Sequence, residues 1–245
     1  MNAPELKEEF NLRYNNALEG APGLDTFEIS SYLTVAQEQY VKFNYDALKD
    51  PTLSFEANEK ARRVLNELVK DEKINSQVTS TRGLVSESVF YELSNSAMYI
   101  VLETATILDT NGPLNGKVIK VVPTTHDEFM MSRENPFRKP NRNKAWRLDL
   151  SKQNSKTTVE IVTAHALSQY NVRYISYPSP IIIGDLTLSS DVAGLGLTID
   201  GETGVATCKL APLSHREIIN IAVENAVLDY RDGTLQARMQ LDSRV

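Results

Sequence analysis

The chain has 245 residues, of which 41% are hydrophobic and 24% charged, a composition typical of a globular protein with one large domain or two small ones. Its formal net charge of −6 argues against a general nucleic-acid coat, because such a protein needs a basic surface to neutralise phosphates. The single cysteine, Cys208, excludes a disulfide framework within the chain, and no apolar run approaches the ~20 residues of a membrane span.

The first 75 residues have the apolar periodicity of helices. In the first segment one stripe recurs every four positions, at Leu6, Phe10, Tyr14 and Leu18. A second helix begins at Asp25, whose capping-box partner is Glu28, and Asp50-Pro51 ends it. Its predicted buried face holds Ile29, Leu33, Ala36, Tyr40 and Phe43. A third helix is expected over residues 54–69, with an inward face formed by Ala57, Ala61, Val64, Leu65 and Leu68.

From about residue 74 the pattern changes to that of strands. Thr, Ser, Val and Tyr become frequent, and the apolar period falls toward two. Strands are predicted over 97–102, 117–122, 146–150, 158–163 and 170–177. Two Asn-Gly pairs within 111–116 predict a turn between strands, and Thr125 with Glu128 predicts the start of a short helix over 125–134.

A last helix follows Pro212 and ends at Asp232-Gly233, and residues 234–245 are expected to be an extended tail that a partner orders. Its broad apolar face consists of Ile218, Ile221, Ala222, Val223 and Val227. The predicted fold class is therefore α+β. Three N-terminal helices and one C-terminal helix form a bundle from residues 1–75 and 212–233, into which an antiparallel β domain is inserted over 76–211.

The sequence gives little support to catalysis. His126, Asp127 and Glu128 are consecutive, and neighbours on a helix point in different directions, so they cannot converge on one metal ion. Cys208 is expected to be a small core residue, and His165 and His215 lack a partner at metal-ligand spacing. We predict no catalytic residue, no metal and no cofactor, with a hydrolase that uses His126 or Cys208 as an alternative.

The segment 133–147 is unusual because it holds six of the 26 basic residues and the only tryptophan. Two prolines keep it out of regular structure, and arginine and aromatic residues are favoured interface anchors. The candidate interface residues are Arg133, Phe137, Arg138, Lys139, Arg142, Lys144, Trp146 and Arg147. Two interpretations stay open: a strip that contacts nucleic acid or an acidic protein surface, and a solvated loop balanced by nearby acids.

A second unusual segment joins a strand to an isoleucine triplet through two prolines. Its candidate contacts with a neighbouring subunit are Tyr177, Pro178, Pro180, Ile181 and Ile182. The alternative interpretation, a crossover that fills the core of the chain itself, is preferred.

Several motifs, in their order along the chain, resemble those of virion proteins of crAss-like phages. They are His126-Asp127-Glu128-Phe129, Asn135-Pro136-Phe137-Arg138-Lys139-Pro140, Trp146-Arg147-Leu148, Val172-Arg173-Tyr174-Ile175 and Pro180-Ile181-Ile182-Ile183. Near the two ends of the chain, Tyr32-Leu33-Thr34-Val35-Ala36-Gln37 and Leu213-Ser214-His215-Arg216-Glu217-Ile218-Ile219 fit the same pattern. The resemblance spans nearly the whole chain.

This resemblance implies a non-enzymatic ring subunit of the neck or tail, a head–tail connector or adaptor stacked below the portal. The implied partners are other copies of the chain in a ring of about twelve, the portal and neighbouring tail ring proteins, and double-stranded DNA that passes through without sequence-specific binding. The implied location is the virion, after synthesis in the host cytoplasm and without a membrane. The polar first ten residues agree with this because they lack the apolar region of a signal peptide.

Overall fold

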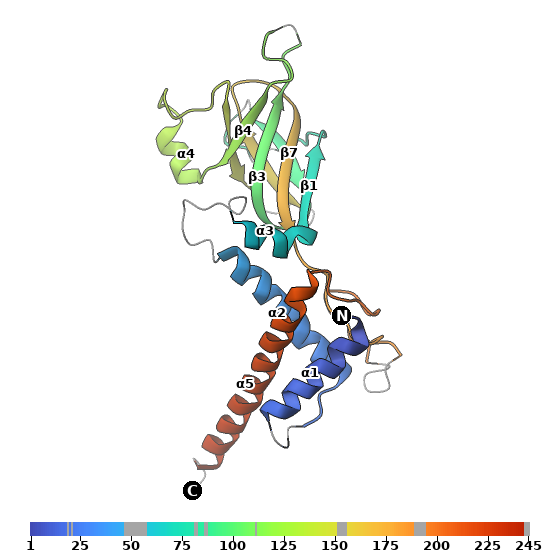
Figure 1. The fold of residues 1–245 in the computed structure, drawn as a ribbon. Helices are drawn as coiled ribbons and strands as arrows, with labels where there is room; N and C mark the ends of the chain where they lie inside the picture. Colours follow the sequence, from blue (N-terminus) through green and yellow to red (C-terminus); the bar gives the residue numbers. More distant parts are fainter. Residues whose placement is uncertain are drawn as a thin grey trace. The chain divides into compact units, whose positions relative to one another are not determined.

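The computed structural model is a mixed α+β protein with five helices and seven strands among the described residues (Figure 1). It describes residues 1–18, 20, 22–46, 58–80, 83–85, 88–110, 112–150, 156–188 and 195–242, with the side chains of 46 and 232–242 left out. The chain divides into two units. The helical unit consists of Met1–Leu68 and Pro178–Val245, and the sheet unit consists of Val69–Tyr177.

Helix α1 (Ala3–Ala17) begins at a reciprocal capping box that the sequence analysis did not identify. The Asn2 side chain accepts a hydrogen bond from the Glu5 amide, and the Glu5 carboxylate accepts one from the Asn2 amide, both at 2.9 Å. The predicted apolar stripe is confirmed for its first three members, Leu6, Phe10 and Tyr14, which are buried.

Helix α2 (Thr26–Asp46) begins at the predicted capping box. The Asp25 carboxylate accepts from the Glu28 amide at 2.7 Å, and the Glu28 carboxylate accepts from the Asp25 amide at 3.0 Å. Four residues of the predicted inward face are buried, but Phe43 is exposed, contrary to the prediction. The buried stripe runs through Val41 and Asn44 in the last turns, which turns Phe43 outward.

The third predicted helix is shorter than expected. Helix α3 (Glu59–Leu65) begins at Asn58, whose side chain accepts from the Ala61 amide at 3.2 Å, and a 3₁₀ turn, η2 (Asn66–Leu68), follows it. Ala61 and Leu65 of α3 and Leu68 of η2 are buried, and Val64 is half-buried. The predicted break at Asp50-Pro51 and the predicted start at 54–57 lie outside the described residues.

A 3₁₀ turn, η3 (Pro212–Ser214), leads into α5 (His215–Asp242), against which α1 and α2 both pack. Ile218, Ala222, Val223 and Val227 are buried as predicted. The predicted end at Asp232-Gly233 is wrong, because the helix continues to Asp242 where an extended tail was expected. A glycine inside a helix costs about 1 kcal/mol, which is too little to stop a helix already propagated from well-packed turns.

The segment after Pro178 lies along α2 instead of belonging to the sheet domain. The Ile181 amide donates to Thr34 Oγ1 at 3.0 Å, and the Ile183 amide donates to Ser30 Oγ at 3.1 Å. Ile181 and Ile183 are two residues apart on the extended segment, and Thr34 and Ser30 are four residues apart on α2. Both spacings correspond to about 6–7 Å, so the two hydrogen bonds can form side by side.

Burial favours one of the two interpretations of this segment. Pro180, Ile181 and Ile182 are buried in their own chain, which is what the core interpretation expects and leaves little of them for a neighbouring subunit. Pro178 is half-buried and Tyr177 is exposed. The boundary between the units accordingly falls at Pro178, and not at residue 211.

We expect Thr34→Val to destabilise the protein by about 1–3 kcal/mol, because it removes the acceptor of the buried Ile181 amide without changing side-chain volume. Urea denaturation measures the difference. The same substitution at the exposed Thr110 should change stability by less than about 0.5 kcal/mol. Equal stabilities of the two variants would show that the bond contributes nothing.

The sheet unit contains a seven-stranded sheet with the order β1-β7-β3-β4-β5-β6-β2. The strands are β1 (Val69–Ile74), β2 (Val89–Leu93), β3 (Ala97–Ile107), β4 (Val118–Pro123), β5 (Lys144–Asp149), β6 (Thr157–Val162) and β7 (Leu167–Ser176). All five predicted strands are present. The prediction missed the two edge strands, β2 and β1. It placed β1 in the helical bundle, because this strand is mostly charged and only partly buried.

One pair of strands departs from the predicted antiparallel arrangement. Strands β4 and β5 run parallel, with Lys120 opposite Lys144 and Val122 opposite Trp146. Parallel neighbours need a crossover of a dozen or more residues, and the connection through α4 (His126–Ser132) provides it. The predicted short helix is therefore the element that makes the sheet mixed. Its N-cap is confirmed, since Thr125 Oγ1 accepts from the Glu128 amide at 3.2 Å.

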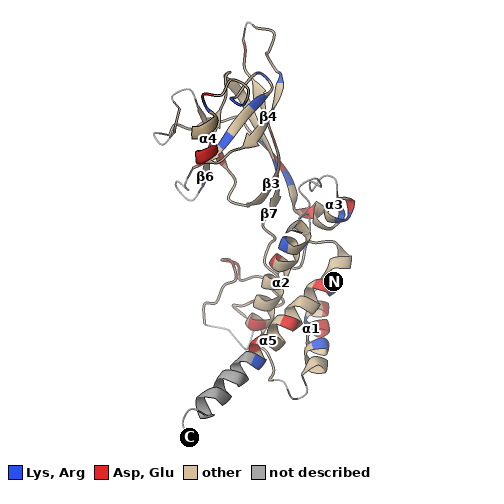
Figure 2. Cartoon of the chain, turned by 90° about the vertical axis from the view of Figure 1, so that its left-hand side faces the viewer, with Lys and Arg blue, Asp and Glu red and all other residues tan. Residues whose placement is uncertain are grey.

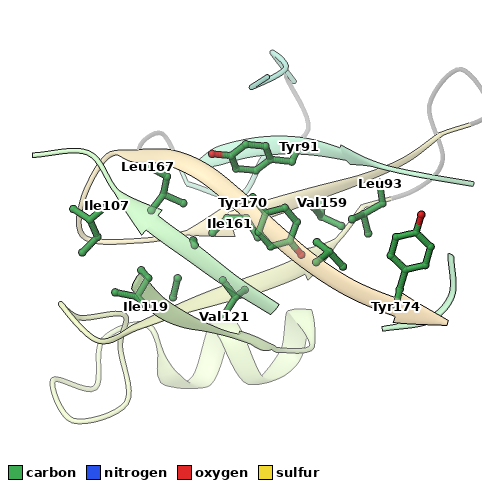
Figure 3. Close-up of a cluster of buried hydrophobic side chains, with 13 residues drawn as sticks. Tyr91, Leu93, Ile107, Ile119, Val121, Val159, Ile161, Leu167, Tyr170 and Tyr174 are labelled. Carbon is green, nitrogen blue, oxygen red and sulfur yellow. The ribbon is translucent and has the colours of Figure 1, made fainter. Parts of the chain in front are cut away.

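The sheet curls around one hydrophobic core (Figure 3). Tyr91 on the edge strand β2 contacts Tyr170 on β7, at a ring-centroid distance of 5.2 Å, although these strands are far apart in the strand order. On the opposite face, α4 covers a second cluster of Phe129, Trp146, Leu148 and Val162. Successive side chains of β5 point to opposite faces of the sheet, so Ala145 belongs to the inner cluster and Trp146 to the outer one.

Candidate functional site

Arg147, predicted as part of an interface, lies inside the sheet unit. It is 8% exposed, and its guanidinium meets the Glu103 carboxylate at 2.6 Å and the Asp149 carboxylate at 2.9 Å. Tyr170 donates a hydrogen bond to the same Glu103 oxygen. Burial acts to lower the pKa of Arg147, but the two carboxylates outweigh it and raise this pKa. Arg147 therefore stays charged and holds three strands together, so its assignment to an interface is wrong.

Trp146 is also a core residue. It is 3% exposed and packs edge-to-face on Phe129 of α4, with ring centroids 6.0 Å apart. The Lys144 ammonium lies 5.6 Å from the centre of the indole, which leaves Lys144 half-buried. The interface prediction failed for Trp146 because both faces of the strand that contains it are covered, one by the inner core and the other by α4.

The five remaining candidates and two methionines are exposed on α4 and on the loop that follows it, and we call this group of residues the α4 surface. Its members are Met130, Met131, Arg133, Phe137, Arg138, Lys139 and Arg142, all exposed. Phe137 is 93% exposed and Met131 is 84% exposed. The two methionines were missed, although Met130-Met131 is visible in the sequence just before the basic loop. Isolated exposed apolar residues are ordinary, but an apolar group next to a basic cluster is typical of a contact surface.

Two asparagines give the loop before β5 a defined shape. Asn135 Oδ1 accepts from the Phe137 amide at 3.0 Å, and the Asn135 carbonyl accepts from the Lys139 amide at 3.0 Å. Asn141 Oδ1 accepts from the Asn143 amide at 2.9 Å. These local turns hold the tip of the loop away from the core, which is why Phe137 is exposed.

The charge on this surface is not balanced locally. Arg133 pairs with the neighbouring Glu134 at 3.2 Å. In the part of the chain that the structure describes, no carboxylate forms an ion pair with Arg138, Lys139 or Arg142. The expectation of a solvated loop balanced by nearby acids is thus met only at Arg133 among the described ion pairs, and three cations are available to an acidic partner.

A pocket of about 410 Å³ lies beside this surface, between the outer face of the sheet and the loop. Phe129, Trp146 and Val162 supply apolar lining, and Arg133 and Lys139 supply positive charge. Its other side is held by a buried carboxylate, because Glu160 accepts from the Leu84 and Val85 amides at 2.9 and 3.3 Å. The pocket shares the apolar and basic character of the α4 surface.

The residues considered for chemistry do not meet. His126, Asp127 and Glu128 are exposed at the acidic first turn of α4 (Figure 2), and the described residues include no cluster of three potential metal ligands. Cys208 is buried, and burial raises the pKa of its thiol, so the reactive thiolate is disfavoured. His165 is half-buried in the turn between β6 and β7.

His215, at the start of α5, is buried and structural. Its Nε2 donates to the Leu210 carbonyl at 3.0 Å, and its Nδ1 accepts from the Met1 amino group at 2.9 Å. Burial lowers the pKa of His215 below its usual 6.5. In the unfolded chain this imidazole gains a proton near pH 6.5, whereas in the folded chain it resists protonation until lower pH.

We therefore expect a stability contribution from His215 that is complete above about pH 6.5 and is lost as pH falls toward the lowered folded pKa. Denaturation of wild type and His215→Gln at about pH 7.5 and about pH 5.5 measures it. The wild type should lose more stability than the variant between these two conditions. The exposed His126→Gln is the control and should keep the wild-type dependence. Parallel losses in all three proteins would contradict the assignment.

These observations define a class of protein. The residues singled out for catalysis lie apart, while an ordered loop presents an aromatic side chain and unpaired cations at the surface. None of the helices that the structure describes is both long and apolar enough to cross a membrane. The features are those of a structural protein that assembles through its surface.

Comparison with known proteins identifies the family. A family model described as phage tail ring protein 3/4 matches residues 1–238. Ring protein 3 of Bacteroides phage crAss001 is 35% identical over 207 residues, which cover 84% of this chain and 85% of that protein. Ring protein 4/5 of the same phage is 31% identical over 248 residues, which cover 100% of this chain and 99% of that protein. The chain therefore belongs to the crAss-like phage tail ring proteins, and it is a structural virion protein, not an enzyme.

Proposed function

We propose that the chain is a head–tail connector subunit. In this proposal its copies form a closed ring in the neck or tail, below the portal and next to other ring proteins, and DNA passes through the ring. The observation that carries the proposal is the extent of the family match, which covers residues 1–238 and so includes both units. Because the whole of the chain aligns with Ring protein 4/5, the shared feature is the complete two-unit subunit and not one domain.

Two properties of the chain support this role. A ring is built head to tail, so each subunit needs two different surfaces that complement each other, and the α4 surface has the character of one of them. The net charge of −6 also suits a conduit, because an acidic wall repels the phosphates of a passing duplex and lets it slide. We propose a ring of about twelve copies.

Native mass spectrometry of the purified chain and imaging of virions test the proposal. We expect either a discrete large oligomer of about twelve copies or a monomer that assembles only when the portal is present. In virion maps the chain should occupy a ring on the tail axis. Its absence from purified particles would end the proposal.

A second candidate function is a nucleic-acid-binding module that uses the basic segment 133–147. It is favoured by the exposure of Arg138, Lys139 and Arg142 without described carboxylate partners. It predicts salt-dependent DNA binding that is lost when these three residues are changed to Ala. Lys60, Arg62 and Arg63, three exposed cations on α3, are the matched control triple. No binding at low salt would dismiss this candidate.

A further inference from the structure

A groove runs between α2 and α5 in the helical unit. Two hydrogen bonds bridge the helices there: the Tyr32 hydroxyl donates to Asp229 at 3.1 Å, and the Asn225 side chain donates to Gln39 at 3.1 Å. Between these bridges the numbering rises on α2 and falls on α5, so the helices are antiparallel. A hollow of about 600 Å³ lies beside them, lined by Phe27, Glu28, Ser31, Tyr32, Val35, Gln39, Asn225, Leu228 and Asp229.

The groove combines apolar surface with negative charge. Val35 is 46% exposed and Leu228 is 55% exposed, so both leave apolar area open to solvent. Glu28 and Asp229 are the charged lining residues, and no lysine or arginine lines the hollow. Burial, followed by the hydrogen bond to Asp229, raises the pKa of Tyr32 to about 12, so this phenol stays neutral.

The opposite combination occurs at the tip of the basic loop. Phe137 projects there almost fully exposed, and Arg138 and Lys139 follow it without a described carboxylate partner. The two cations of the tip complement the two carboxylates of the groove in charge, and the Phe137 ring complements the apolar surface that the groove leaves open. Pro136 and Pro140 flank the tip and restrict its backbone, which lowers the entropy lost on docking.

We propose that the α2–α5 groove receives the loop tip Phe137-Arg138-Lys139 of another copy of the chain. This inference rests on the ring function proposed above, and it names the two surfaces that meet. The tip and the groove belong to different units, so each copy would present one of them to each of two neighbours. A contact between two different surfaces repeats head to tail, as a closed ring requires.

Protein is favoured over DNA as the partner of the tip because of its apolar part. Phosphates would pair with Arg138 and Lys139, but they would leave the Phe137 ring in water. A protein groove covers an aromatic anchor, and a phenylalanine buries about 150–250 Å² when it is covered.

Disulfide cross-linking between two differently tagged chains tests the contact. Both chains carry Cys208→Ser, which removes the native thiol; one carries Phe137→Cys and the other Val35→Cys. We expect mild oxidation of the assembled mixture to give a covalent dimer that carries both tags. Leu12→Cys replaces Val35→Cys in the control, because Leu12 is also exposed but lies on α1 outside the groove, and it should give at least tenfold less product.

Charge reversal provides an independent test on the same chains. Arg138→Glu with Lys139→Glu should reduce assembly at least tenfold, and so should Asp229→Lys, with circular dichroism verifying that each variant folds. Mixing the tip variant with the groove variant should restore assembly, because the acidic tip of one then meets the groove of the other that carries the new lysine. Phe137→Ala, at an almost fully exposed position, serves as a variant whose folding is not at risk.

The outcomes separate this inference from the ring function. If wild-type rings form and neither the cross-link nor the reversed charges have an effect, the groove contact is wrong and the ring function stands. If the cross-link is missing and the reversed tip instead loses DNA binding, the tip is a DNA contact and the inference is overturned. Absence of the chain from virions overturns the ring function itself.

Discussion

Arg147→Ala should destabilise the protein by about 3–5 kcal/mol, because it leaves a buried carboxylate without its cation. The guanidinium is the only cation within ion-pair distance of the buried Glu103 carboxylate among the described residues. Removing it leaves this carboxylate in the core of the curled sheet, where the Tyr170 hydroxyl is its one remaining hydrogen-bond partner among the described residues. Urea denaturation followed by circular dichroism measures the loss.

Two comparisons show whether the loss comes from an unpaired buried charge. Arg63→Ala breaks the exposed ion pair with Glu59 on α3, and it should change stability by no more than about 0.5 kcal/mol. The triple variant Glu103→Leu, Arg147→Met, Tyr170→Phe removes the whole polar group and should recover most of the stability lost in Arg147→Ala. If the triple variant is as unstable as the single one, packing around these side chains, and not charge, accounts for the loss.

The same buried arginine shows why the site could be predicted only in part. The density of basic residues predicts an exposed irregular loop before β5. It also groups Trp146 and Arg147 with that loop as interface residues, although the local pattern predicts a strand over 146–150. In β5 every residue from Ala145 to Leu148 is buried, because one face meets the inner core and the other meets α4. A buried arginine follows from its partners, and Glu103 lies on β3, far away in the sequence.

The fold was predictable wherever one periodic pattern determined an element. The stripe of α1, the cap of α2 and the alternating strands were all predicted from local spacing. Errors arose where packing overrode local signals, as in α5, which continues through Gly233, and in β1, a charged edge strand.

The docked segment at Ile181 shows a signal that was present and not interpreted. Ser30, Thr34 and Gln37 lie on the buried face of α2, where three polar residues need partners. The extended chain from Ser179 to Ile183 supplies these partners through its backbone, since Gln37 also donates to the Ser179 carbonyl at 3.0 Å. A polar stripe on an otherwise apolar helix face therefore predicts a docked extended segment, although not which segment it is.

Trp146→Ala should cost about 3–5 kcal/mol, because it removes the aromatic partner of Phe129 from the outer core and leaves a cavity beneath α4. Thermal and urea denaturation measure the change. The loop itself should keep its turns, since Asn135 and Asn141 form them with their own neighbours.

Phe137→Ala is the matched comparison, because this aromatic residue lies in the same basic segment but is almost fully exposed. Its stability should stay within about 0.5 kcal/mol of wild type, while its assembly into rings should fall. Trp146→Ala should do the opposite: it lowers stability, and the folded fraction of the variant still assembles. The loss of assembly should therefore equal the unfolded fraction. If Trp146→Ala instead kept wild-type stability and lost assembly, the indole would have to belong to the contact between subunits, and the division of this segment into a buried strand and an exposed anchor would be wrong.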